Sequence, residues 1–336
     1  MRFGWLSALA RWLAFVRILT KRSRKLRSVI PGSRSDTRKP GAASAVLYDP
    51  LGSWFALRAP RNDDYGRLRA AILSCVAALL VSPATAEPRR IVSLDYCADQ
   101  FVLALADREQ IAALSRGSQR DDSYFRARAA GLRQSRVTLE EVLALAPDLV
   151  VRNWGGQWDA ETTYARFGVS VLQVGDAATF NAAREDVLDA ARIIGRGARG
   201  AAIAHDLDVR LARLRASWSR ERAPVVYLSA GGALAGADVL MDDVIAAAGG
   251  RNLRDEAGWA MLPLERMIEA PPALVALGFF DTGRTRTSAW SPSRHPALGR
   301  MLANARTVSL PAAAVSCEAW TAIDAAEIIA RALRRL

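Results

Sequence analysis

Short apolar runs alternate with helical patterns from Ile91 onward, and this alternation predicts the fold class. Apolar runs of about four to eight residues are typical of buried strands, and apolar positions three to four residues apart are typical of helices. Alternating strands and helices form parallel sheets covered by helices, so the pattern predicts two α/β lobes with central parallel sheets. The predicted strands are 91–94, 111–114, 149–151, 169–174, 225–228, 274–277 and 307–310; the predicted helices are 99–106, 139–146, 160–167, 239–248, 264–269 and 319–333.

A long helical stretch separates the two sets of strands. The helical pattern runs from Asn181 to Ser219, with one break at Gly195-Arg196-Gly197. At 1.5 Å per residue the part after the break is about 33 Å long, which is enough to connect two lobes. The sequence therefore predicts an N-terminal lobe over residues 87–178, linker helices over 179–221 and a C-terminal lobe over 222–336.

The positive charge of the chain is concentrated near its start. Of the formal net charge of +12, residues 1–66 carry +9, Arg67 and Arg69 add two, and residues 87–336 carry +1. Nucleic-acid binding needs clustered positive charge on the folded part of a protein. We therefore predict no nucleic-acid partner for residues 87–336, which we expect to be monomeric.

Residues 67–86 have the pattern of a secretory signal peptide. Two arginines precede an apolar run from Ala70 to Val81, and Ala84-Thr85-Ala86 follows it. The run is shorter than the ~20 residues that span a bilayer, so we predict cleavage after Ala86 and a periplasmic location. Residues 1–66 have two interpretations. We favour the first, in which translation begins near Arg67 and residues 1–66 are an upstream region with a basic, disordered composition. In the second, they form a basic anchor on an anionic membrane surface.

Several motifs after residue 89 resemble the periplasmic substrate-binding proteins of ABC importers for cobalamin and ferric siderophores. They are Arg90-Ile91-Val92-Ser93-Leu94, Leu139-Glu140 with Pro147–Val151, and Ala248–Asn252 followed by Pro263-Leu264-Glu265. The resemblance covers residues 89–335. It implies two lobes joined by one long helix, and a cargo of cobalamin, a ferric siderophore or a heme-like chelate between the lobes. It further implies delivery to an inner-membrane ABC permease, with no catalysis and no cofactor.

Loops after the predicted strands hold the candidate ligand contacts, because open α/β sheets bind ligands at the carboxyl ends of their strands. Aromatic side chains offer broad apolar faces to a macrocycle, and arginines pair with anionic oxygens. The candidates are Asp95, Tyr96, Cys97, Arg116, Arg152, Trp154, Gly231, Trp259, Phe280 and Cys317. Three interpretations remain for Cys97 and Cys317, one in each lobe: a disulfide, two buried thiols, or thiols at the ligand site.

Two glutamates match the acidic residues with which the family docks on its permease. Glu140 and Glu265 lie 125 residues apart at the start of similar helical patterns, although each also suits the helix dipole alone. In the first lobe we expect Asp99 to act as a helix N-cap. The two histidines, His205 and His295, lack partners at ligand spacing, so we predict no metal site.

Two other functional classes stay open at this stage. One is a secreted two-domain α/β enzyme with its active site in the cleft, for which the sequence offers no triad or phosphate loop. The other is a sensor or scaffold that binds the same ligand without transporting it.

Overall fold

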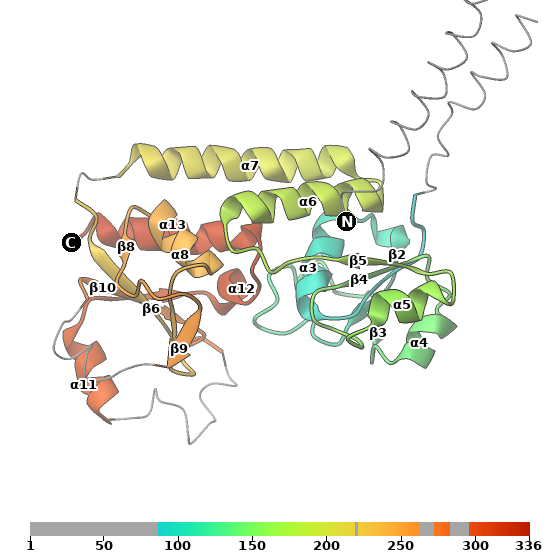
Figure 1. Cartoon of the computed structure of the whole chain (residues 1–336), viewed down its shortest axis with the longest axis horizontal. Helices are drawn as coiled ribbons and strands as arrows, with labels where there is room; N and C mark the ends of the chain where they lie inside the picture. Colours follow the sequence, from blue (N-terminus) through green and yellow to red (C-terminus); the bar gives the residue numbers. More distant parts are fainter. Residues whose placement is uncertain (1–86, 219–220, 262–271, 283–295) are drawn as a thin grey trace, which may run out of the picture. The chain divides into compact units, whose positions relative to one another are not determined.

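Two separate sheets in the computed structural model confirm the prediction of two α/β lobes (Figure 1). The structure describes residues 87–218, 221–261, 272–282 and 296–336. The predicted leader, the signal peptide and the helix 264–269 with Glu265 lie outside these residues. All of the described residues belong to one compact unit.

The first sheet is wholly parallel, with the strand order β3-β2-β1-β4-β5. Successive side chains of β1 face opposite sides: Ile91 packs in a cluster with Phe101, and Val92 packs in a different cluster with Tyr164. Both faces of the sheet are therefore buried under helices. Its elements are β1 (Ile91–Ser93), α3 (Tyr96–Leu105), η1 (Arg108–Gln110), β2 (Ile111–Ser115), β3 (Gln134–Ser135), α4 (Leu139–Ala144), β4 (Leu149–Arg152), α5 (Ala160–Ala165) and β5 (Ser170–Gln173).

The second sheet has the predicted parallel strands, and two further strands that were not predicted make it mixed. Strands β11, β10, β6 and β8 are parallel, whereas β7 and β9 pair antiparallel. The reversal after β6 is made by Gly232, whose left-handed backbone (φ +86°) allows its N–H to donate to Ser229 O at 2.8 Å. The elements are β6 (Pro224–Ser229), β7 (Ala233–Ala235), α8 (Leu240–Ala247), β8 (Arg251–Asn252), β9 (Trp259–Met261), β10 (Leu274–Gly278), α11 (Pro296–Asn304), β11 (Thr307–Leu310), α12 (Ala312–Val315), η3 (Trp320–Ala322) and α13 (Ile323–Leu333).

The linker consists of two helices, α6 (Phe180–Ile194) and α7 (Gly197–Ala216), which run side by side (Figure 1). The predicted break is confirmed: Gly195, in the left-handed region at φ +78°, ends α6. Gly200 then lets the two backbones approach, because a Cβ there would collide with Ala191. At 1.5 Å per residue, the 20 residues of α7 extend about 30 Å.

A continuous hydrophobic cluster connects the two sheets through the linker helices. It contains Ile91 of β1, Leu207 of α7, Val225 of β6 and Ile323 of α13. The Asp243 carboxylate adds a polar tie, because it accepts the N–H of the first residue of α6 at 2.7 Å. No helix among the described residues is both long and apolar enough to cross a membrane.

Candidate functional site

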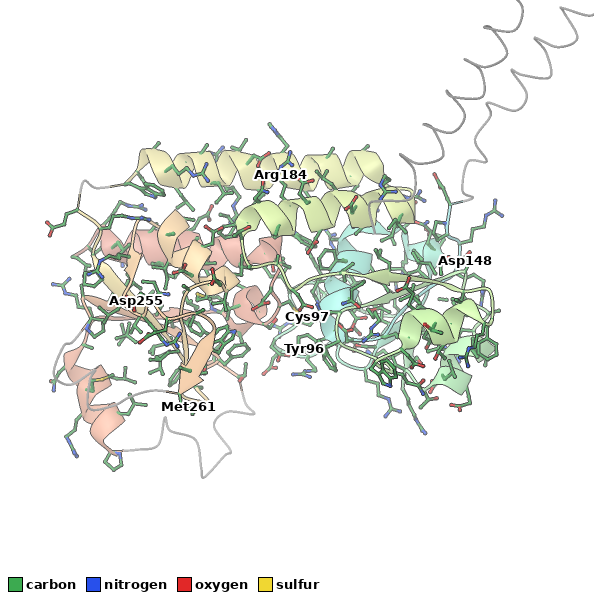
Figure 2. All side chains as sticks on the ribbon, in the orientation of Figure 1. Tyr96, Cys97, Asp148, Arg184, Asp255 and Met261 are labelled. Carbon is green, nitrogen blue, oxygen red and sulfur yellow. A yellow bond between two sulfur atoms is a disulfide. The ribbon has the colours of Figure 1, made fainter. Side chains whose placement is uncertain are left out.

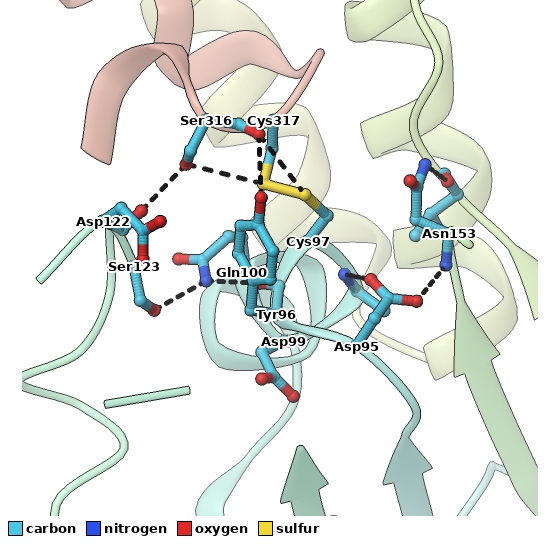
Figure 3. The surroundings of a disulfide bond; sticks show 12 residues. Asp95, Tyr96, Cys97, Asp99, Gln100, Asp122, Ser123, Asn153, Ser316 and Cys317 are labelled. Carbon is cyan, nitrogen blue, oxygen red and sulfur yellow. Dashed lines mark hydrogen bonds between the residues drawn. A yellow bond between two sulfur atoms is a disulfide. The ribbon is translucent and has the colours of Figure 1, made fainter. Parts of the chain in front are cut away.

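Asp95 ties together two loops at the carboxyl end of the first sheet. Its Oδ1 accepts the Ala98 N–H at 2.8 Å and caps α3, and its Oδ2 accepts the Asn153 N–H at 2.8 Å (Figure 3). The same Oδ2 also accepts the Gly155 N–H at 2.8 Å. The side chain is 2% exposed. Gly155 is required because a Cβ there would strike Leu94 O. Asp95 therefore positions the loops of β1 and β4.

The expectation that Asp99 caps this helix is wrong, because α3 begins three residues earlier and Asp95 is its cap. Asp99 lies buried in the first turn, where its carboxylate accepts the Ser115 N–H at 3.0 Å and the Ser115 hydroxyl at 2.6 Å. Burial raises the pKa of the Asp99 carboxyl to about 7, although both Ser115 hydrogen bonds oppose the shift. The group fastens the end of β2 to α3.

An aromatic and cationic cluster stands on these loops. The rings of Tyr96 and Trp154 meet edge to face with centroids 5.9 Å apart, and the Arg120 guanidinium lies 4.7 Å from the Tyr96 ring centroid. Arg120 is fixed by a bidentate pair with Asp122 at 3.0 and 2.7 Å. Trp154 remains 59% exposed, so its indole is available to a ligand. We call Tyr96, Arg120 and Trp154 the aromatic cluster.

Cys97 and Cys317 form a disulfide, which decides among the three interpretations and rules out free thiols at the ligand site (Figure 3). The bond joins the first turn of α3 to the segment between α12 and η3, and both cysteines are buried. Beside it, Tyr96 Oη donates to Ser316 O at 3.4 Å and Ser316 Oγ donates to Asp122 O at 2.8 Å. The aromatic cluster is thus held against the second lobe by one covalent and two polar links.

On the second sheet, Trp259 presents a comparable surface. Its ring meets the buried Tyr227 ring edge to face at 5.8 Å and is 48% exposed. Met261, two residues along β9 and therefore on the same face, is 64% exposed (Figure 2). Gly231 lies exposed in the β6–β7 turn, and Phe280 lies half-buried after β10. Each lobe therefore carries one exposed tryptophan braced by a tyrosine.

Other predicted residues lie elsewhere. Val151 of β4 packs on the α3 side of the sheet, so the next residue, Arg152, faces the other side. Its Nη1 donates to Gln157 O at 2.8 Å. Arg116 is exposed in the loop after β2. Among the remaining tryptophans, Trp158 is 94% exposed, whereas Trp320 is buried edge to face against Phe101 and belongs to the core.

Sequence reasoning missed Arg120 and Met261. Arg120 lies in the loop after β2 and is followed by two aspartates. This local sequence does not reveal that its guanidinium lies over the Tyr96 ring. Met261 was missed because β9 was not predicted.

Of the docking candidates, Glu140 is exposed in the first turn of α4, and Glu265 lies outside the described residues. His205 is exposed on α7, and within the described ranges no three His, Cys, Asp or Glu residues form a metal-binding group.

Comparison with known proteins identifies the class. Residues 91–288, more than half of the chain, match the model of the periplasmic binding protein family. The chain therefore belongs to the periplasmic binding protein family, whose members are binding proteins rather than enzymes.

Individual relatives narrow the comparison. A cobalamin-binding protein of Halobacterium salinarum is 26% identical over 200 residues, which are 57% of this chain and 54% of the relative. The chain thus spans about half the length of the curated relatives that it matches.

Solved structures share the fold. The periplasmic heme-binding protein HutB of Vibrio cholerae gives a TM-score of 0.60 at 20% identity, covering 73% of this chain and 98% of that one. The periplasmic vitamin B12-binding protein BtuF of Vibrio cholerae gives 0.57 at 19% identity, covering 74% and 97%. Neither the family match nor these neighbours support the enzyme alternative.

Proposed function

We propose that this protein captures a metal-containing tetrapyrrole, with cobalamin as the first candidate, and delivers it to an ABC permease. The observation that carries the proposal is a pair of exposed tryptophans that each pack edge to face on a tyrosine, Trp154 on the first lobe and Trp259 on the second. A corrin or porphyrin is broad and largely apolar, and indole rings braced by a neighbouring tyrosine offer matching rigid faces. The names of the relatives, which bind cobalamin, vitamin B12 or heme, support the same cargo class.

Charge agrees with a cargo that has an apolar body and a few polar substituents. Next to Trp154, Arg120 supplies a guanidinium, but Asp122 already accepts two of its hydrogen bonds. A highly anionic ferric chelate, such as a tris-catecholate, would require several uncommitted cations, whereas the one cation of the aromatic cluster, Arg120, is already paired with Asp122. We therefore place anionic ferric siderophores second, as an outcome that the binding test distinguishes.

The location of the protein follows from the same proposal. Residues 67–86 have the features of a signal peptide cleaved after Ala86, and the family and neighbours are periplasmic. Glu140, exposed on α4, is the described half of the proposed permease contact, because an exposed carboxylate steers association with a basic surface. The protein binds and presents its cargo without chemical change.

The test is a calorimetric titration of the purified protein with cyanocobalamin, hemin and a ferric tris-catecholate. We expect saturable one-to-one binding of a tetrapyrrole. Trp154→Ala should weaken it about tenfold, or about 1.4 kcal/mol, through loss of the indole face. Trp158→Ala is the matched control, because Trp158 is more exposed and lies only four residues away.

Three results would count against the proposal. Equal loss of affinity in the two tryptophan variants would remove the aromatic cluster from the site. Saturation by the ferric tris-catecholate alone would replace the cargo class but keep the transport function. Silence with all three ligands would reject the proposed cargo altogether.

A further inference from the structure

A cavity of about 870 Å³ lies at the opposite end of the first lobe from the aromatic cluster. Its lining includes Asp107, which precedes η1, and Ile111, the first residue of β2. These residues mark the amino end of β2, whereas Tyr96 and Trp154 follow the carboxyl ends of β1 and β4. The lining shares no residue with the candidate cargo site. Helix α7 and the η3–α13 segment complete the wall.

The floor of this cavity is apolar. It is formed by Leu103 of α3, Phe125, two α7 residues (Ile203 and Leu207) and Trp320 of η3. Leu103, Leu207 and Trp320 are buried, and the other two are half-buried. The volume falls within the range of about 300–1,000 Å³ that is usual for small-molecule sites. An apolar body of moderate size would therefore be desolvated there.

The acidic side chains at the rim are already paired with arginines. The Asp107 carboxylate accepts from Arg196 at 2.6 Å and from Arg199 at 2.7 Å, and these hydrogen bonds lower the pKa of Asp107. Asp206 lies 3.9 Å from Arg210. The charge of Asp107 is thus compensated before any ligand arrives, whereas Asp206 shares Arg210 with Asp324 and Glu327.

Two rim arginines, by contrast, have no carboxylate partner within the described part of the chain. Arg108 donates to the carbonyl oxygens of Arg128 and Ala130 at 3.4 and 2.7 Å. Arg128 donates to Leu103 O at 3.2 Å and lies 4.9 Å from the centroid of the Phe125 ring. A guanidinium has five N–H donors, so both groups keep donors and full positive charge. The bond from Arg108 to Arg128 O also links the two chain segments that carry these arginines.

We propose that this cavity is a second binding site, for a small amphiphilic carboxylate. The apolar body of the ligand lies on the floor formed by Leu103, Ile203 and Trp320. Its carboxylate pairs with Arg108 and Arg128, whose planar forks suit two oxygens. Such a ligand contacts α3, α7 and η3 together, so its binding stabilises the folded protein. This site is independent of the proposed cargo.

The probe is decanoate, with decanol as its uncharged counterpart, titrated into the full-length protein by calorimetry below micelle-forming concentrations. We expect one saturable site for decanoate and at least tenfold weaker binding of decanol. Ala202→Trp fills the cavity, because Ala202 is exposed and lines it, and should abolish binding. Ala201→Trp is the control on the same helix, because Ala201 is exposed but does not line the cavity.

A second pair of variants tests the charge. Arg128→Gln should weaken decanoate at least tenfold and leave decanol unchanged, whereas Arg126→Gln, an exposed neighbour outside the lining, should change neither. This pair keeps the test valid if Ala202→Trp fails to fold. Equal affinity for decanol and decanoate, decanoate binding that survives Ala202→Trp, or no saturation at millimolar decanoate would each overturn the proposal. Cyanocobalamin titrations on the same proteins report separately on the cargo site.

Discussion

Removing the Cys97–Cys317 disulfide should cost the protein a large part of its stability. The bond closes a loop of 220 residues and ties the first turn of α3 to the second lobe. In the chain-entropy model, a loop of this length restricts the unfolded state by about 5 kcal/mol, and native disulfides contribute about 2–5 kcal/mol in practice. We therefore expect a loss of about 2–5 kcal/mol in the free energy of unfolding.

The assay is urea unfolding of a Cys75→Ala protein, which leaves only the two bonded cysteines, in its oxidised and reduced forms. A Cys97→Ala/Cys317→Ala variant is compared with both. Reduction should lower the unfolding midpoint of the parent and leave the variant unchanged. Any further difference between the reduced parent and the variant measures the lost packing of two buried sulfurs.

Two results would refute this reasoning. Oxidised and reduced parent proteins that unfold at the same urea concentration would show that the bond does not restrict the unfolded chain. Peptide mapping without reductant that fails to join the Cys97 and Cys317 peptides would remove the bond itself.

The remaining predictions concern docking and pH. Reversing charge with Glu140→Arg and Glu265→Arg should spare calorimetric cargo binding but impair uptake in cells, whereas Glu161→Arg, also in a first helical turn, should affect neither; normal uptake by the double variant would exclude docking through these glutamates. For pH, burial raises the pKa of Asp99 from 3.8 in the unfolded chain to about 7 in the folded protein. Between these two pH values, the folded protein therefore holds a proton that the unfolded chain has released. The stability contributed by Asp99 is fully present below its unfolded-state pKa of 3.8 and is lost as the pH rises through its folded-state pKa of about 7. The loss amounts to up to about 1.4 kcal/mol per pH unit. Urea unfolding across this pH range should show a flatter dependence for Asp99→Asn, and an unchanged slope would contradict the assignment.

Residues close in sequence determined much of the fold. The alternation of apolar runs and helical patterns predicted two α/β lobes, and the Gly195-Arg196-Gly197 break predicted the division between α6 and α7. These features were predictable because periodicity and backbone freedom act over a few residues. The antiparallel strands β7 and β9 were missed because they are three residues long and depend on one turn at Gly232.

The candidate site depended far more on tertiary structure. Trp154 and Trp320 are alike in sequence context, both beside predicted loops, yet one is 59% exposed and the other is in the core. Asp95 and Asp99 are four residues apart, yet one caps α3 and the other is buried against Ser115. Burial depends on which distant segment packs over a side chain, and local sequence does not contain that information.

The cysteines show the same division most clearly. Sequence established that the folded part of the chain holds two cysteines, in separate lobes, and left three interpretations of them. Whether they bond depends on the distance between their Cα atoms, which is 5.5 Å here. That distance is set by the packing of α3 against the α12–η3 segment across 220 residues of chain, and only the tertiary structure decides it.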